Sequence, residues 1–302
     1  MLDRQITSFG RWLRFENKSE KTIGIYVGAA RKIGEWLAQR DVTDWADVQA
    51  EHVRDFIITV LETPSAKSAT GKSDGYANNL FRALQQFAKW YAREEEAPNV
   101  MAGMRPPTLP EQETTVLKDE QLRALLKSCE GREFVARRDT AILYLFMDSG
   151  IRRGELAGLG VDDLNLDYRE VTVLGKGRRT RTVAFGKKAA WALDRYLTER
   201  ARHKYADFPP LWLGEKGKGP MTGSGIFQMI QRRGVLVGID GLHPHVLRHT
   251  WAHLMKQANM SDDEIMKNAG WRSPQMLARY AASTASQRAR ESAKRLAPGD
   301  RL

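Results

Sequence analysis

Hydrophobic residues in the first hundred positions recur every three or four residues, which is the spacing of amphipathic helices. Between residues 20 and 39 apolar side chains line one face, and Ser19 is placed to cap the first turn. Similar patterns over residues 2–15, 49–62 and 75–93 predict three more helices. We therefore expect a small four-helix module at the front of the chain.

The second part of the chain mixes two periods. Apolar residues alternate in 170–174 and 179–185, and a Gly-Lys-Gly turn joins these segments, so the pattern predicts a β-hairpin. Helical spacing resumes over residues 187–201, 223–237 and 245–257. We expect a mainly α fold with a small β-sheet, which places this part in the α+β class.

A proline-rich stretch separates the two parts. Residues 97–114 carry four prolines and no helical period, which is typical of a linker. We therefore divide the chain into a helical domain at 1–100, a linker at 101–114 and a larger domain at 115–302.

Charge is distributed unevenly between these parts. The chain has 48 lysines and arginines against 37 aspartates and glutamates, a net charge of +11. Residues 1–110 hold 15 basic and 14 acidic residues, whereas residues 111–302 hold 33 and 23. A basic half favours a polyanionic partner, because each neutralised phosphate releases counterions. Charge alone leaves open a basic protein that binds nothing acidic.

Other features of the composition restrict the location of the protein. No apolar run is long enough to span a bilayer, and the N-terminus has no signal-peptide core. Cys129 is the only cysteine, so neither an internal disulfide nor a cysteine metal cluster can form. We expect a cytoplasmic, nucleoid-associated protein that has no membrane partner.

Three short motifs suggest chemistry on a phosphodiester. Gly150-Ile-Arg-Arg-Gly-Glu-Leu156 follows an apolar helix, and His243-Pro-His-Val-Leu-Arg-His-Thr250 opens another. Ala269-Gly-Trp271 comes next, and Tyr280 follows nine residues after the tryptophan. Metal-free cleavage of a phosphodiester needs a nucleophile, cations around the phosphate oxygens and an acid for the leaving oxygen. Arginine suits the second task because its planar fork binds two oxygens.

In this order and spacing, the motifs resemble the signature of the tyrosine recombinases of the phage integrase family. The resemblance covers essentially the whole chain. It implies a SAM-like helical core-binding domain in front of a catalytic domain with a C-terminal tail helix. Without a separate arm-binding domain, the chain is similar to the simpler Xer-type members.

The resemblance implies a role for each catalytic residue. Arg152 and Arg248 would clamp the scissile phosphate, and His245 would bind the phosphate or handle a proton. Lys176, in the hairpin turn, would be the acid for the 5′-oxygen. Tyr280 would attack and form a 3′-phosphotyrosyl link, which needs no metal, ATP or cofactor.

Further residues are expected around this set. Trp271 stands where many members have histidine, so it could donate a hydrogen bond to the phosphate but carry no proton. Glu155 and His249 would orient the catalytic groups. Three histidines at 245, 249 and 253 could also suggest a metal site, but no acidic residue lies among them. The basic residues expected to contact DNA are Lys67, Lys72, Arg178, Arg179 and Arg181.

The expected partner is double-stranded DNA, held between the two domains. Recombination exchanges four strands, so four protomers should assemble on two sites, with a related recombinase or accessory factors as further partners. Ala281, Ala285, Ala289 and Ala293 form a stripe at helical spacing. We hypothesise that this tail helix docks into a neighbouring protomer.

Three alternatives remain open. Ala66-Lys-Ser-Ala-Thr-Gly-Lys-Ser73 fits a loose phosphate-binding loop, and an ATPase would need strands at Phe56–Leu61 and Leu143–Asp148. A DNA-binding protein of the same fold that no longer cuts would lack competent side chains, which this chain has. A type IB topoisomerase would use similar chemistry without pairing two sites.

Overall fold

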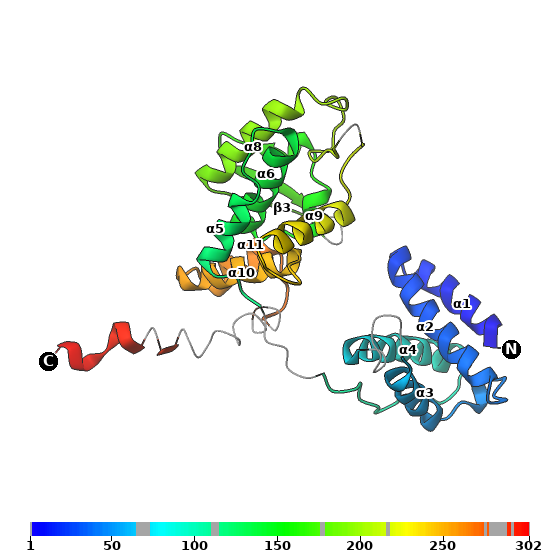
Figure 1. The fold of residues 1–302 in the computed structure, drawn as a ribbon. Helices are drawn as coiled ribbons and strands as arrows, with labels where there is room; N and C mark the ends of the chain where they lie inside the picture. The colour runs from blue at the N-terminus through cyan, green and yellow to red at the C-terminus, as the bar shows by residue number, and fades with distance from the viewer. Residues whose placement is uncertain are drawn as a thin grey trace. The chain divides into compact units, whose positions relative to one another are not determined.

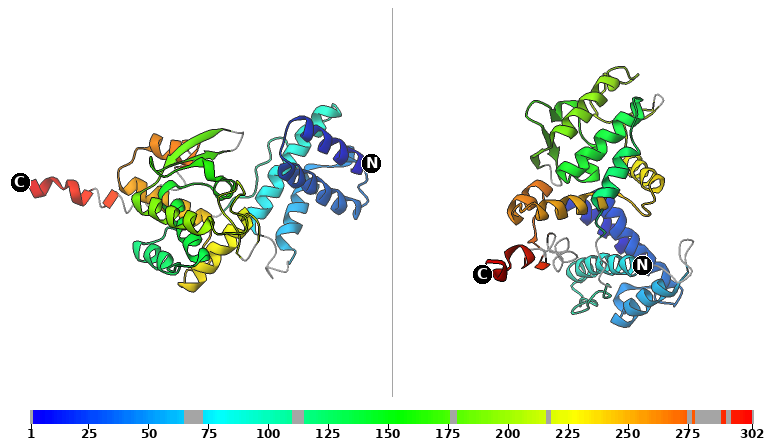
Figure 2. Two further views of the ribbon diagram at one scale, coloured as in Figure 1. Left: turned by 90° about the horizontal axis from the view of Figure 1, so that it is seen from above. Right: turned by 60° about the vertical axis from the view of Figure 1, so that its left-hand side comes forward.

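The computed structural model describes residues 2–64, 73–109, 115–175, 179–215, 218–274, 277, 289–290 and 293–301. These residues form two compact units, Met1–Gln112 and Glu113–Leu302, drawn in Figures 1 and 2. Along the described chain, no helix combines the length and apolar character needed to cross a bilayer.

The first unit is helical. Its elements are α1 (Leu2–Phe15), α2 (Glu20–Ala38), the 3-10 helix η1 (Trp45–Asp47), α3 (Ala50–Glu62) and α4 (Asp74–Glu94). Helix α2 packs against both α1 and α4, as Figure 1 shows. The Ser19 side chain accepts a hydrogen bond from the Thr22 amide, which confirms the predicted N-cap of α2.

Aromatic side chains form the centre of the first unit. The ring of Phe87 lies 4.6 Å from the ring of Trp45 and 5.2 Å from that of Phe9. The Trp45 indole also donates a 3.2 Å hydrogen bond to the carbonyl of Leu2. Buried aromatic rings contribute large apolar areas, so this cluster holds α1, η1 and α4 together.

The second unit places helices around a three-stranded antiparallel sheet of order β1-β2-β3. Helix α6 is central and packs against α8 and α10, and the hairpin of β2 and β3 lies beside these helices (Figure 2). The elements are α5 (Asp119–Lys127), α6 (Phe134–Ser149), α7 (Arg153–Ala157), η2 (Val161–Asp163), β1 (Leu164–Asn165), β2 (Glu170–Leu174), β3 (Thr180–Ala184), α8 (Lys187–Arg200), α9 (Gly223–Leu236), α10 (Pro244–Gln257), α11 (Asp262–Ala269) and η3 (Pro298–Arg301).

The predicted hairpin is confirmed in the second unit. Glu170 pairs with Ala184 and Leu174 with Thr180, and the Gly175 amide donates a 2.7 Å hydrogen bond to the carbonyl of Arg179. Val171, Val173 and Val183 are buried, so the alternating pattern gives one face of the sheet to the core. The mainly helical fold with a small sheet agrees with the expected α+β class.

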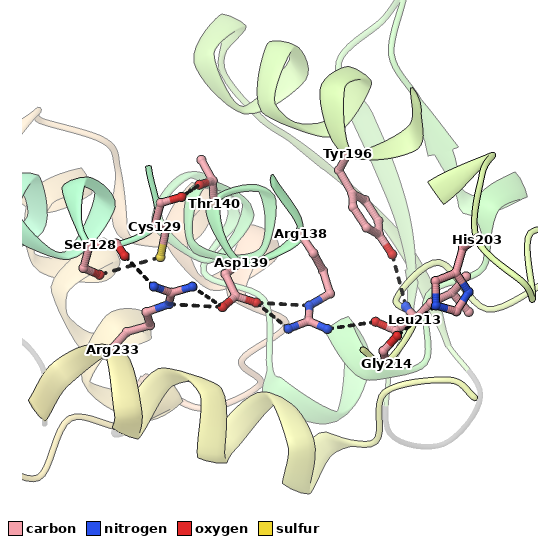
Figure 3. Close-up of polar contacts among 10 residues, drawn as sticks. All are labelled: Ser128, Cys129, Arg138, Asp139, Thr140, Tyr196, His203, Leu213, Gly214 and Arg233. Carbon is pink, nitrogen blue, oxygen red and sulfur yellow. Dashed lines mark hydrogen bonds and ion pairs between the residues drawn. The ribbon is translucent and has the colours of Figure 1, made fainter. Parts of the chain in front are cut away.

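A buried ion cluster ties α6 to α9. Asp139, which is 2% exposed, accepts two hydrogen bonds from Arg138 and two from Arg233 (Figure 3). Arg138 also donates to the carbonyl of Leu213, and Arg233 donates to that of Ser128. Asp139 and its two arginine partners therefore link four segments of the second unit.

The strands that an ATPase would need are absent from their expected places. Phe56–Leu61 lies within α3, and Leu143–Asp148 lies within α6. Both are short apolar runs, in which periodicity alone does not separate a buried helix from a strand. A phosphate-binding loop needs a preceding strand, so the ATPase alternative is wrong on this point. Residues 66–72 of the candidate loop lie outside the described residues.

Candidate functional site

A glycine turn brings the end of α6 against α10. Gly150 caps α6 in the left-handed region, with φ of +55°, which favours glycine. Any side chain at this position would collide with the indole ring of Trp251. That indole donates a 2.9 Å hydrogen bond to the carbonyl of Asp148. The close approach sets Arg152, two residues after the turn, beside α10.

Arg248 lies at the centre of the candidate site. It is 2% exposed, and its guanidinium donates to the carbonyl of Gly150 and, at 2.6 Å, to that of Ala269. Its Cζ lies 5.0 Å from the centre of the Trp271 ring. A buried charge needs several such partners, and here they come from the ends of α6 and α11.

Arg152 also binds the backbone at the C-terminal end of α11. Its Nη2 donates a 2.8 Å hydrogen bond to the carbonyl of Gly270, and its Nη1 lies 2.7 Å from Oε1 of Glu155. The two guanidinium groups therefore hold consecutive carbonyls, those of Ala269 and Gly270. This convergence builds a compact positive site, because two guanidinium groups are held against neighbouring backbone carbonyls.

Glu155 is the buried counter-charge of this site. It pairs with Arg152 and also with Arg181, whose Nη2 lies 2.7 Å from Oε2 and whose Nε donates to the carbonyl of Asn268. Burial by itself raises the pKa of the Glu155 carboxyl. The hydrogen bonds from Arg181 and from the backbone and side chain of Arg152 outweigh it and lower the pKa to about 2.

Histidines on and before α10 complete the site. The ring of His245 lies 6.2 Å from that of His243 and 6.3 Å from that of His249. Partial burial lowers the pKa of His245, and the charges of His243, Arg248, Arg153 and Arg152 lower it further. Burial, followed by the neighbouring charges, lowers the pKa of His249 to about 4. Both imidazoles therefore favour the neutral form at pH 7.

Trp271 is mostly enclosed, with 6% of its surface exposed. It packs in a small apolar cluster with Trp251 and Ile265, and one face of its ring lies toward Arg248. The prediction that its indole binds a phosphate stays a prediction.

The structure brings six of the predicted residues together, and five others lie outside the described part of the chain. Arg152, Glu155, His245, Arg248, His249 and Trp271 converge in the second unit. Arg179 is exposed and immediately precedes β3. The residues that lie outside the described part of the chain are Lys67, Lys72, Lys176, Arg178 and Tyr280.

Some residues of the site carry no sequence signal of their role. The sequence pattern predicts that Arg181 contacts DNA. In the structure its guanidinium binds Glu155, which lies 26 residues earlier in the chain. The carbonyls of Ala269 and Gly270 and the ring of Trp251 belong to no chemical motif. A glycine followed by an arginine motif could have indicated the tight turn at Gly150.

The charge of Glu155 is expected to stabilise the fold only above acidic pH. Because its folded pKa is lowered from 4.5 to about 2, the contribution is present above the unfolded pKa and disappears as pH falls through the folded one. We expect Glu155→Gln to lower the free energy of unfolding by about 3 kcal/mol at pH 7. Urea unfolding measures the free energy of unfolding of wild type and of Glu155→Gln. The difference between them should become smaller between pH 5 and pH 3, whereas a constant difference would contradict the prediction.

Comparison with known proteins identifies relatives along most of the chain. Residues 115–287 match the model of the phage integrase family. A tyrosine recombinase XerC of Pseudomonas fluorescens is 30% identical over 262 residues, which make up 85% of this chain and 84% of that protein. Tyrosine recombinase XerC 1 of Ralstonia nicotianae is 31% identical over 278 residues, 84% of this chain and 82% of that one.

Solved structures share the fold at lower identity. The XerH recombinase in a post-cleavage complex with a palindromic difH substrate has a TM-score of 0.73 and 19% identity, covering 92% of this chain and 80% of that one. The Tn1549 transposon integrase in complex with transposon right-end DNA has a TM-score of 0.73 and 18% identity, covering 97% and 99%. These likenesses confirm the predicted fold class.

Proposed function

The chain belongs to the phage integrase family, and from this premise we propose that it is a site-specific recombinase that cleaves and rejoins double-stranded DNA. The observation that carries the proposal is the convergence of Arg152 and Arg248 on the consecutive carbonyls of Ala269 and Gly270. Two guanidinium groups held in one place are a receptor for the non-bridging oxygens of a phosphodiester.

The proposed reaction begins with attack on the scissile phosphate. The phenolic oxygen of Tyr280 forms a bond to phosphorus, and the bond from phosphorus to the 5′-oxygen breaks. Arg152 and Arg248 stabilise the additional negative charge that develops on the non-bridging oxygens. The product is a 3′-phosphotyrosyl link and a free 5′-hydroxyl, and the reverse attack by a 5′-hydroxyl rejoins the strand.

Proton transfers accompany both bond changes. His245 is neutral at pH 7 because burial and nearby positive charges lower its pKa, so it accepts the proton or hydrogen bond of the tyrosine hydroxyl. Lys176, which lies between β2 and β3 in the sequence, donates a proton to the leaving 5′-oxygen. Glu155 keeps Arg152 oriented through their 2.7 Å contact, and His249 supports His245 one turn along α10.

The rest of the assembly follows from strand exchange. The predicted domain at 1–100 binds one side of the duplex and the predicted domain at 115–302 binds the other, with Lys67, Lys72, Arg178 and Arg179 on the phosphates. Four protomers act on two sites in the cytoplasm, with a related recombinase or accessory factors. The tail helix beyond Tyr280 connects neighbouring protomers.

A covalent trapping experiment tests the proposal. The protein is incubated, without metal or ATP, with nicked duplexes taken from the DNA that flanks its own gene. We expect a protein–DNA adduct that survives denaturation, and peptide mass spectrometry should locate the nucleotide on Tyr280. Linkage to another residue would contradict the mechanism. DNA binding without an adduct would favour the non-cutting protein, and an adduct without strand exchange between two sites would favour the topoisomerase.

A further inference from the structure

The guanidinium of Arg153 occupies a defined position beside the candidate site. Arg153 opens α7 immediately after Arg152, and its Cζ lies 5.4 Å from the centre of the Phe227 ring on α9. A Cβ at Gly223, the first residue of α9, would lie 3.6 Å from its Nε. The half-buried side chain is therefore enclosed between the start of α9 and an aromatic ring, rather than extended into solvent.

The positive charge of Arg153 is not balanced within the described residues. Arg152 and Arg181 share the carboxylate of Glu155, and Arg138 and Arg233 share that of Asp139. In the same described segments, no carboxylate forms an ion pair with Arg153. The N-terminal end of α9 next to it carries a partial positive charge. A partly buried cation in such a place favours an anionic ligand.

A row of rings connects Arg153 with the predicted catalytic histidine. Phe227 stacks on His243 at 6.5 Å between centroids and 11° between planes, and His243 lies 6.2 Å from His245. The charge of Arg153 contributes to the lowered pKa of His245, together with those of Arg248 and Arg152. Arg153 therefore lies on the same side of the second unit as the proposed phosphate site.

We propose that Arg153 binds a second DNA phosphate, adjacent in the strand to the scissile one, and that Phe227 holds its guanidinium in place for this contact. The inference rests on the proposed function, because it requires a DNA strand to lie across Arg152 and Arg248. The contact fixes which phosphate of the strand enters the cleavage site. Arg153 is thus a positioning residue, whereas Arg152 would contact the reacting phosphate itself.

Neutral phosphates in the DNA test this contact directly. Once the adduct assay has located the scissile phosphate, each neighbouring phosphate is replaced in turn by an uncharged methylphosphonate. We expect wild-type protein to bind about tenfold more weakly when one neighbour is neutral. Arg153→Gln should bind unmodified DNA about tenfold more weakly than wild type. Its affinity should not fall further when the methylphosphonate replaces that neighbouring phosphate. Its plot of log affinity against log salt should be shallower by about 0.9.

A matched control separates this effect from a general loss of charge. Arg195 lies over the ring of Trp191 on α8, with 4.3 Å from its Cζ to the ring centre. Helices α8 and α10 lie on opposite sides of α6 in Figure 1, so the helix that carries Arg195 is separate from the one that carries His245. Arg195→Gln should keep the wild-type response to every methylphosphonate. Phe227→Leu retains an apolar side chain but loses the ring. The loss of affinity that the same neutral phosphate causes should therefore be smaller for Phe227→Leu than for wild type.

The outcomes distinguish failure of this inference from failure of the proposed function. If wild type forms the adduct and Arg153→Gln responds to each neutral phosphate as wild type does, the role of Arg153 is overturned while the recombinase stands. If wild type binds DNA and forms no adduct, cleavage fails. In that case every phosphate of the bound duplex is replaced in turn, and a position where the methylphosphonate weakens wild type but not Arg153→Gln would still establish the phosphate contact.

Discussion

Tyr280→Phe is expected to bind DNA as wild type does and to form no covalent adduct. Phenylalanine keeps the ring but has no oxygen to attack phosphorus, so the covalent route is closed. We expect cleavage to fall by at least ~10³-fold, to the limit of detection. Binding should change little, because a single hydroxyl contributes about 1 kcal/mol at most. Gel analysis of trapped adducts and fluorescence anisotropy measure the two quantities separately.

Tyr205→Phe is the control for this result. The ring of Tyr205 packs against His203 and Phe208 in the segment after α8, and the proposed mechanism gives it no role. Its adduct yield should equal that of wild type. An adduct formed by Tyr280→Phe would mean that another residue is the nucleophile, and the assignment based on the motif spacing would be wrong.

Asp139→Ala is expected to produce the largest loss of stability. Asp139 accepts four hydrogen bonds from Arg138 and Arg233, and Arg138 is only 4% exposed. Removing the carboxylate leaves two enclosed guanidinium groups without their counter-charge (Figure 3). Breaking a buried pair in this way costs about 3–5 kcal/mol, which corresponds to a fall in Tm of about 10 °C for a unit of this size. Calorimetric unfolding of the full chain measures it.

Glu199→Ala provides the comparison for Asp139. Glu199 pairs with Arg137 at 2.9 Å and with Arg202 at 3.4 Å, but its side chain is 20% exposed. Its removal should cost about 1 kcal/mol or less, because solvent screens the pair. Replacing Arg138 and Arg233 by methionine together with Asp139→Leu should recover much of the lost stability. Equal losses in Asp139→Ala and Glu199→Ala would contradict the role of the buried cluster.

The elements that could be predicted from sequence are those with a local physical cause. The hairpin of β2 and β3 follows from alternating valines and a glycine-rich turn, and α2 follows from its apolar stripe and the cap at Ser19. The strands required by an ATPase at Phe56–Leu61 and Leu143–Asp148 are helical instead. An apolar run has no period, so only its packing partners decide its secondary structure.

Arg181 illustrates why the surroundings of the site could not be predicted. In the sequence it is one of several basic residues in a predicted hairpin, and nothing there separates it from the others. In the structure its guanidinium binds Glu155, which lies 26 residues earlier on α7. Which arginine of the hairpin faces inward depends on the alternation of β3 relative to the core, and on what lies opposite.

The sequence by itself determined the identity of the chemical groups. Arg152, His245, Arg248 and Tyr280 stand at the spacing of one family, and we propose that they act on a phosphodiester, for which arginine and lysine are not interchangeable. Only the tertiary structure decided how the groups meet. The two arginines hold neighbouring carbonyls at Ala269 and Gly270, more than a hundred residues after Arg152. Such contacts arise from packing between distant elements, which local patterns do not encode.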